Sequence, residues 1–213
     1  MVKEATTTTM KPGTTALCTI RQEGVSEEAT GLTDVKILRA RARQGVEDGA
    51  VTAGCKVKAE TVIKLLNEAL ATEIVCVLRY KRHYSMATEI SLLKVKGEFL
   101  RHANEEQVHA DQLAERIVQL GGEPNLFPEH LLSRSRSECV EGESLVEMIT
   151  EDLIAERIAI DSYREMVAYV GTDDPTTCKM LEGILAQEGE HAEDLASLLP
   201  ALVSETKSHR AGR

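Results

Sequence analysis

Four glutamates stand where an amphipathic helix normally places an apolar side chain. The apolar residues around each of them recur at steps of three and four, the spacing of the buried face of a helix. Two of the four open a Glu-x-x-His sequence, and residues three apart on a helix share one face, so each histidine lies beside its glutamate. The six residues are Glu73, Glu106, His109, Glu156, Glu188 and His191.

This set of side chains predicts a dinuclear metal site. Four carboxylates in one helical core would repel one another strongly unless cations neutralised them. Two divalent ions carry the four positive charges required, and the two imidazoles then act as neutral ligands. One glutamate from each of two helices, with a Glu-x-x-His pair from each of two others, is the donor set of di-iron carboxylate bundles. Polar core positions held only by hydrogen bonds would require four separate exceptions to the rule that unpaired glutamates avoid protein cores.

The glutamates also divide the chain into two similar halves. Glu73 and Glu106 lie 33 positions apart, and Glu156 and Glu188 lie 32 apart. Each half therefore predicts a helix with a glutamate, a turn, and a helix with Glu-x-x-His. The four helices are expected at about 58–88, 91–120, 144–170 and 175–199, with Pro200 ending the last.

The connection at 121–143 is long enough to cross the whole bundle. The sequence therefore predicts an all-α fold, a four-helix bundle over residues 59–200 with one long crossover between helices two and three.

Two further segments flank this bundle. Residues 1–58 are Thr-rich and predict a partly flexible N-terminal extension, in which Asp34 caps a possible short helix at 35–44. Residues 201–213 predict a flexible tail. The extension carries an excess of only two positive charges, whereas the rest of the chain carries an excess of twelve negative ones. Nucleic-acid binding is therefore not expected, although Lys36, Arg39, Arg41 and Arg43 form the one basic cluster that could support it.

The five cysteines are scattered and include no C-x-x-C pair, which favours reduced thiols over a disulfide framework or a zinc knuckle. No apolar run approaches the roughly 20 residues of a membrane span, and the N-terminus has no apolar signal-peptide core. The sequence thus predicts a soluble, cytoplasmic protein without a membrane partner.

Beyond these patterns, residues 59–200 resemble the bacterioferritin branch of the ferritin superfamily. The resemblance lies in LNEALATEIVCVLRY (66–80), HANEEQVHAD (102–111), LGGEPN (120–125), EDLIAERIAIDSYREM (151–166) and LAQEGEHAEDL (185–195). It implies a ferroxidase that oxidises Fe(II) to Fe(III) with O₂ or H₂O₂, and stores and detoxifies iron in a hollow homo-oligomer. It also implies that the six residues above are the iron ligands, with Glu106 and Glu156 bridging and Glu73 and Glu188 terminal.

The chain departs from that family at three places. Haem-binding bacterioferritins have a methionine after the second-helix glutamate, and Gln107 stands there, which argues against haem. His102 replaces a carboxylate that helps iron pass inward in some relatives. The extension 1–58 has no counterpart in the short N-terminus of typical bacterioferritins.

Three other functions stay open. One is a Dps-like mini-ferritin with a dodecameric shell that protects DNA or removes peroxide. Another is a di-iron cargo protein associated with a larger compartment. The third is a rubrerythrin-like enzyme, against which the missing C-x-x-C pairs argue.

Neighbouring polar residues receive simpler interpretations. Tyr80 and Tyr163 are expected in the core, where either phenol could bond a ligand carboxylate. The remaining residues are grouped by expected environment. His83 and His130 are expected to face solvent or lie in loops. Glu105 and Glu190 are expected to be solvated charges. Asp111, and Glu193 or Asp194, are possible hydrogen-bond partners of the two imidazoles.

Overall fold

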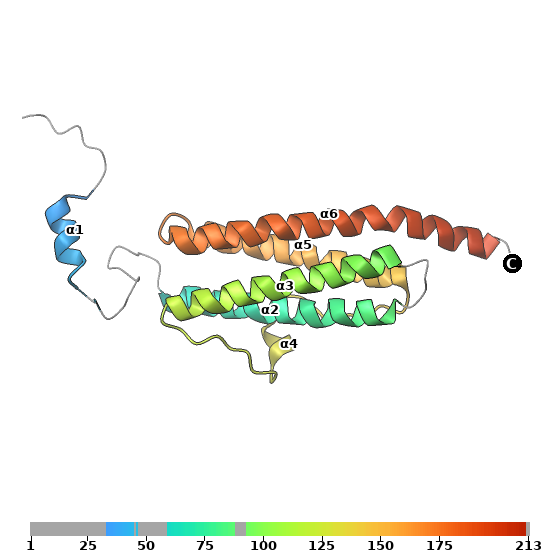
Figure 1. The fold of residues 1–213 in the computed structure, drawn as a ribbon, viewed down its shortest axis with the longest axis horizontal. Coiled ribbons are helices and arrows are strands. Elements are labelled where there is room, and N and C mark those ends of the chain that lie inside the picture. Colours follow the sequence, from blue (N-terminus) through green and yellow to red (C-terminus); the bar gives the residue numbers. More distant parts are fainter. Residues whose placement is uncertain (1–32, 45, 47–58, 88–92, 212–213) are drawn as a thin grey trace, which may run out of the picture.

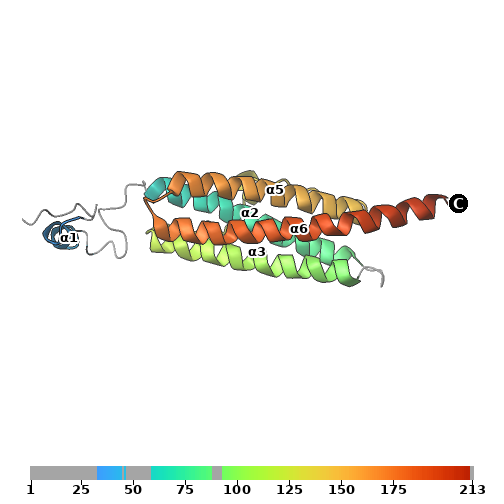
Figure 2. The same cartoon turned by 90° about the horizontal axis from the view of Figure 1, so that it is seen from above.

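The computed structural model describes residues 33–44, 46, 59–87 and 93–211. Four long helices form the bundle, and the described residues contain no strand (Figures 1 and 2). They are α2 (Ala59–Met86), α3 (Leu93–Gln119), α5 (Leu145–Val170) and α6 (Pro175–Ala211). Helix α2 packs mainly on α3, and α5 mainly on α6, so the bundle consists of two helical hairpins. The predicted all-α bundle is confirmed.

Local signals in the sequence set the ends of these helices. The Ser144 side chain accepts a hydrogen bond from the Glu147 backbone N–H, and the Glu147 side chain reaches back to the Ser144 backbone, which forms a capping box at the start of α5. The turn that follows α3 contains Gly121, whose φ of 79° is readily adopted only by glycine. Gly171, with a φ of 50°, ends α5 in a similar way.

The connection between α3 and α5 crosses the bundle alongside α2, as predicted, and contains the short helix α4 (Leu131–Arg134) (Figure 1). Polar side chains of α2 hold it in place. Asn67 accepts from the Asn125 backbone at 2.7 Å, and Thr72 accepts from the Arg136 backbone at 3.0 Å. Arg79 donates to the Glu138 carbonyl at 3.0 Å.

Two of the predicted boundaries differ in the structure. The short helix α1 covers Val35–Arg41 rather than 35–44, and Asp34 caps it by accepting from the Lys36 backbone at 2.7 Å. The prediction that Pro200 ends the fourth helix is wrong, because α6 continues to Ala211. Proline removes one helical N–H, but Leu202 beyond it still packs against the core, which favours continuation. The rest of the extension, residues 1–32 and 47–58, lies outside the described residues.

The bundle core consists of two apolar clusters, one toward each end. One contains Leu66, Leu70, Leu113, Ile117, Leu181 and Ile184, and the other contains Tyr80, Phe99, Ile149 and Leu195. The residue numbers of the six predicted donors fall between those of the two clusters on every helix. Closely packed apolar layers above and below the donors keep water away and hold the helices in register. None of the described helices is long and apolar enough to cross a membrane.

Candidate metal centre

The structure brings the six predicted residues together in the middle of the bundle. Glu73 comes from α2, Glu156 from α5, and each of α3 and α6 supplies one Glu-x-x-His pair. Each of the six residues is at most 1% exposed. Ionisable side chains are rarely buried to this extent unless they are paired or bind a metal.

The six residues form two overlapping groups whose potential ligand atoms lie within 4.8 Å of one another. The first group is Glu73, Glu106, His109 and Glu188, and the second is Glu106, Glu156, Glu188 and His191. Glu106 and Glu188 belong to both groups. The sequence analysis expected Glu156 to bridge and Glu188 to be terminal, whereas the structure places Glu188, and not Glu156, in both donor groups. Helix phase alone does not show which carboxylate lies between the two groups.

Each of the two shared glutamates, Glu106 and Glu188, has one oxygen near His109 and the other near His191. His109 Nδ1 lies 2.9 Å from Glu188 Oε1 and 3.2 Å from Glu106 Oε2. His191 Nδ1 lies 3.4 Å from Glu106 Oε1 and 3.8 Å from Glu188 Oε2. Two carboxylates, each shared between two imidazole-bearing positions, match the geometry of a dinuclear centre.

Unsatisfied polar atoms at this centre test whether a cation fits. Among the described residues, Glu73 Oε2, Glu106 Oε1, Glu188 Oε1 and His191 Nδ1 are buried and make no hydrogen bond. Buried polar atoms in folded proteins nearly always have a partner, and isolated exceptions require an explanation. Three carboxylate oxygens and an imidazole nitrogen, divided between the two donor groups, are the kind of donors that Fe, Mn or Zn ions bind. The residues present therefore fit two metal ions.

The ionisation of the carboxylates reflects their crowding. Burial, reinforced by the charge of Glu106, raises the pKa of Glu73 to about 8. Burial and the neighbouring charges of Glu106 and Glu156 also raise the pKa of Glu188 well above its usual value. Burial alone would raise the pKa of Glu106 as well, but the hydrogen bond from His109 and the nearby imidazole of His191 outweigh it and lower that pKa. Without metal, the cluster therefore retains protons that a bound cation would displace.

The two histidines respond in the opposite way to burial. Burial alone would lower the pKa of His191, but the nearby carboxylates of Glu106 and Glu156 outweigh it and raise the pKa to about 10. The carboxylates raise the pKa of His109 in the same way. Without metal, the carboxylates therefore favour the protonated form of both imidazoles.

Two tyrosines hold the outer carboxylates by contacts between the hairpins. Tyr163 of α5 donates to Glu73 Oε1 of α2 at 2.5 Å, and Tyr80 of α2 donates to Glu156 Oε1 of α5. Both phenols are at most 1% exposed. The tyrosines are therefore core residues and also orient two of the carboxylates.

The outer nitrogens of the imidazoles bind residues that the sequence did not single out for this role. His191 Nε2 lies 2.9 Å from Glu105 Oε2, and His109 Nε2 lies 3.0 Å from Gln187 Oε1. The expectation that Glu105 is merely solvated is wrong. Of the expected partners, Asp111 instead accepts from Gln107 at 2.9 Å, and Asp194 accepts from Arg101. The outer imidazole nitrogens are thus held by Glu105 and Gln187 rather than by Glu193.

A second buried polar cluster lies toward the α2–α3 turn. His83 is fully buried, with Nδ1 2.8 Å from Asp152 Oδ2, so the expectation that it faces solvent is wrong. Arg79 Nε lies 2.9 Å from Asp152 Oδ1. The signal in the sequence was helical spacing, since His83 follows Tyr80 by three positions and shares its buried face. His130 is exposed in the crossover, as predicted.

Comparison with known proteins finds relatives among the ferritin-like proteins. A profile described as the ferritin-like domain matches residues 63–202. A bacterioferritin of Rhodobacter capsulatus is 30% identical over 135 residues, covering 63% of this chain and 80% of the relative. A bacterioferritin of Streptomyces coelicolor is 30% identical over 142 residues, covering 65% of this chain and 79% of that protein.

Solved structures agree with these sequence relatives. The dodecameric thioferritin, a bacterioferritin-related protein of Bacteroides fragilis, superposes with a TM-score of 0.68 at 31% identity, over 72% of this chain and 92% of that one. Dps of Thermosynechococcus elongatus, at 21% identity and a TM-score of 0.63 over 66% of this chain and 90% of that one, shares the fold. With its profile match, its bacterioferritin relatives and its helical bundle, the chain belongs to the ferritin-like family.

Proposed function

We propose that this protein is a ferroxidase that binds two Fe(II) ions per chain at the candidate metal centre, oxidises them, and stores the ferric product inside a homo-oligomeric shell. The observation that carries the proposal is the pair of overlapping donor groups sharing Glu106 and Glu188, with buried donor atoms that make no hydrogen bond. The bacterioferritin relatives support iron as the metal.

The protein's own residues account for the direction of the reaction. Four carboxylates stabilise the more highly charged Fe(III) better than Fe(II), so binding at this centre favours oxidation. Each iron gives up one electron. Two electrons and two protons convert O₂ to H₂O₂, and with H₂O₂ as oxidant two electrons and two protons give two molecules of water. Iron binding itself supplies protons, since it displaces them from Glu73 and Glu188.

Storage requires a closed assembly of many chains, which homo-oligomers with point-group symmetry provide. The dodecameric thioferritin relative supports a shell of twelve. With a chain mass of 23.4 kDa, twelve copies weigh about 280 kDa and twenty-four about 560 kDa. Native mass spectrometry with electron microscopy of the particle distinguishes these shells from a small, solid oligomer, which would contradict the storage role.

The oxidation step is tested by Glu106→Ala and His191→Ala. Each removes a donor from the centre, so the fast phase of Fe(II) oxidation should disappear while the helical content stays nearly unchanged. Glu190→Gln is the control, because Glu190 is exposed on α6, directly before His191, and is absent from both donor groups. Oxidation at the wild-type rate in both donor variants would refute the assignment.

A further inference from the structure

The donor residues of the two hairpins are related by the internal repeat. The corresponding pairs are Glu73 and Glu156, Tyr80 and Tyr163, Glu106 and Glu188, and His109 and His191. Their contacts are exchanged between the hairpins, since each tyrosine bonds the glutamate of the other hairpin. Every donor therefore has a chemically identical counterpart, and these residues alone would give two equivalent metal positions.

The residues that hold the imidazoles break this equivalence. Each is the residue directly before the Glu-x-x-His of the facing helix, and each reaches the outer nitrogen of the opposite histidine. Glu105 Oε2 lies 2.9 Å from His191 Nε2, and Gln187 Oε1 lies 3.0 Å from His109 Nε2. Glutamate and glutamine have nearly the same shape, so the two contacts differ mainly in one negative charge.

We propose, on the basis of the function proposed above, that Glu105 and Gln187 make the two metal positions unequal. The position beside His191 binds a divalent cation more tightly and fills first, and the position beside His109 exchanges its metal more readily. The physical reason is that an imidazole donating its outer N–H to a carboxylate becomes a more basic ligand than one donating to an amide oxygen. Glu105 and Gln187 are positioning residues, because they act through the histidines.

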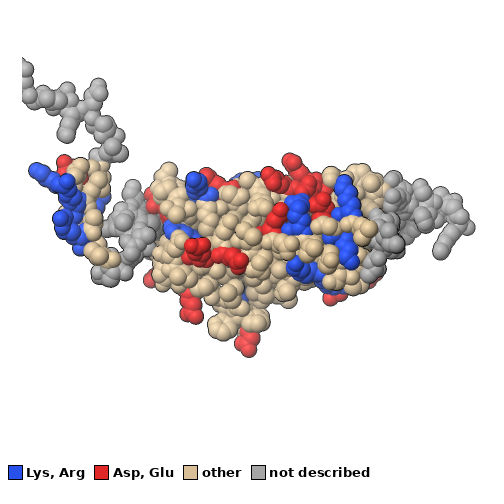
Figure 3. Space-filling model, in the orientation of Figure 1, with Lys and Arg blue, Asp and Glu red and all other residues tan. Residues whose placement is uncertain are grey.

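The surroundings of Glu105 keep its carboxylate in place. Arg101 donates to the same Oε2 through Nη1 at 2.8 Å and to Glu98 Oε2 through Nε at 2.9 Å, and it also bonds Asp194. Acidic and basic side chains lie side by side on the face of the molecule drawn in Figure 3. Three carboxylates around one guanidinium leave a net negative charge outside His191, which further favours a cation on that side.

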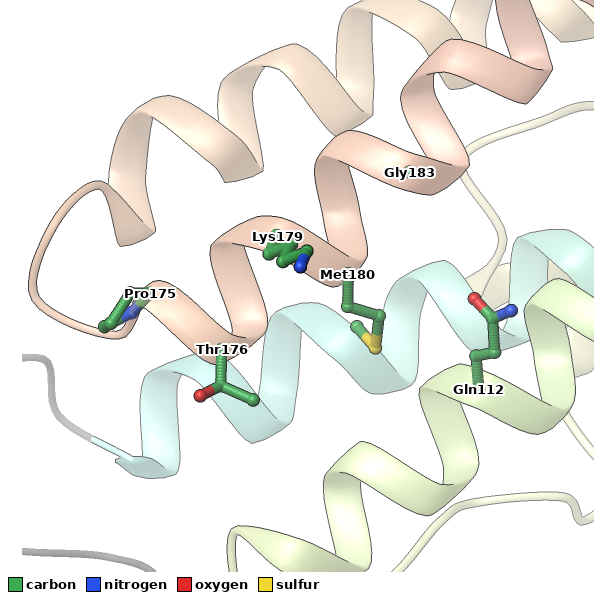
Figure 4. A pocket seen from close by; sticks show the side chains of 6 residues that line it. All are labelled: Gln112, Pro175, Thr176, Lys179, Met180 and Gly183. Atoms are coloured by element: carbon green, nitrogen blue, oxygen red, sulfur yellow. The ribbon is translucent and has the colours of Figure 1, made fainter.

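On the His109 side, the three residues at the corresponding positions of the repeat carry no carboxylate. The repeat places Gly183 where Arg101 stands, Met180 where Glu98 stands, and Gln112 where Asp194 stands. These three residues line a surface groove of about 560 Å³ together with Pro175, Thr176 and Lys179. Met180 and Gln112 lie between α6 and α3 in this groove (Figure 4). The charge difference at the two imidazoles thus extends to the surface above them.

The experiment exchanges the two positioning residues. Metal-free full-length protein is titrated anaerobically with Co(II), followed by calorimetry and visible absorption, for the wild type, Glu105→Gln, Gln187→Glu and the double exchange. Anomalous diffraction from crystals carrying one Co(II) per chain locates the first ion. Glu190→Gln is the matched control, since it removes the same charge from an exposed residue adjacent to His191. Circular dichroism checks that each variant is folded.

Opposite changes are expected from the two single exchanges. Glu105→Gln should weaken the first binding step about tenfold or more, and Gln187→Glu should strengthen the second by a similar factor. Either change brings the two affinities together. In the double exchange the first Co(II) should move from the His191 side to the His109 side. Repulsion between two bound ions weakens the second step in every variant, so the decisive quantity is the change between variants.

Three results would overturn the inference. The first is that Co(II) binds beside His109 first in the wild type. The second is that the first Co(II) stays beside His191 in the double exchange. The third is that the single exchanges shift neither binding step more than the control does. If two Co(II) bind equally in all variants while Fe(II) is still oxidised, the inference fails and the proposed function stands. If fewer than two Co(II) bind per chain in the wild type, both fail.

Discussion

The buried cluster of Arg79, His83 and Asp152 allows a stability prediction that does not depend on metal. Asp152 is fully buried and lies 2.9 Å from Arg79 Nε and 2.8 Å from His83 Nδ1. The Arg79 side chain is only 2% exposed. Asp152→Asn keeps the shape of the side chain, so it opens no cavity, but it removes the negative charge and leaves the guanidinium with only neutral partners.

The size of the effect follows from the burial of both partners. Breaking a buried ion pair by removing one partner costs about 3–5 kcal/mol. For a chain of this length, each kcal/mol corresponds to about 2–4 °C in melting temperature, so the expected loss is about 6–20 °C. Burial raises the pKa of Asp152 although His83 and Arg79 oppose it, so the stability of the wild type falls as pH rises through that pKa, and the loss should be smaller at pH 7.5 than at pH 5.

The assay is thermal unfolding of metal-free protein, followed by circular dichroism at equal protein concentrations, since assembly and metal both add stability. Asp161→Asn is the control, because Asp161 and Arg164 form a pair whose side chains are 74% and 65% exposed. Such pairs contribute about 0–1 kcal/mol. A loss in Asp152→Asn no larger than in the control would refute the reasoning. Replacing both partners, as Arg79→Met with Asp152→Leu, should cost less than the sum of the single changes.

The remaining predictions concern pH, metal and the extension. The pKa of Glu73 is raised to about 8 and that of His191 to about 10, so the stability these groups contribute to the metal-free protein is complete below their unfolded values and is lost as pH rises through about 8 and 10. Calorimetry from pH 6 to 10 should show a falling melting temperature, and a rise would contradict this sign. Zn(II) at one hundred times its dissociation constant should add about 2.7 kcal/mol of stability and release protons, measurable by titration calorimetry in buffers of different ionisation enthalpy. No thermal shift and no proton release would count against a buried metal site. Deleting residues 1–58, which supply none of the six donors, should leave Fe(II) oxidation unchanged, and the full chain should not shift DNA in a gel at moderate salt. Tight, salt-sensitive DNA binding that is lost on truncation would support the Dps-like alternative instead.

Much of the architecture could be predicted because it depends on periodicity within one helix. The buried glutamates interrupt an otherwise apolar face, and the starts and ends of the helices are marked by residues such as Ser144, Gly121 and Gly171. Fold and donor set follow from these local signals alone.

What the sequence did not predict depends on contacts between helices. Glu105 lies on a face that periodicity assigns to solvent, and its role exists only because His191 of α6 lies opposite. The place of Glu188 in both donor groups likewise depends on how the hairpins dock. Pro200 is a local stop signal that packing of Leu202 overrides.

The division of the bundle into two hairpins has a consequence for how it opens. Packing is dense within each hairpin and sparser between them, while each donor group takes residues from both. A metal ion bound at this centre would therefore connect the two hairpins. In its absence, hydrogen exchange should show the hairpins separating before either one unravels, because local opening follows the boundaries with the fewest contacts. Metal binding would then stabilise the contact between the hairpins. The loss of a single ion would loosen that interface and leave the helices intact.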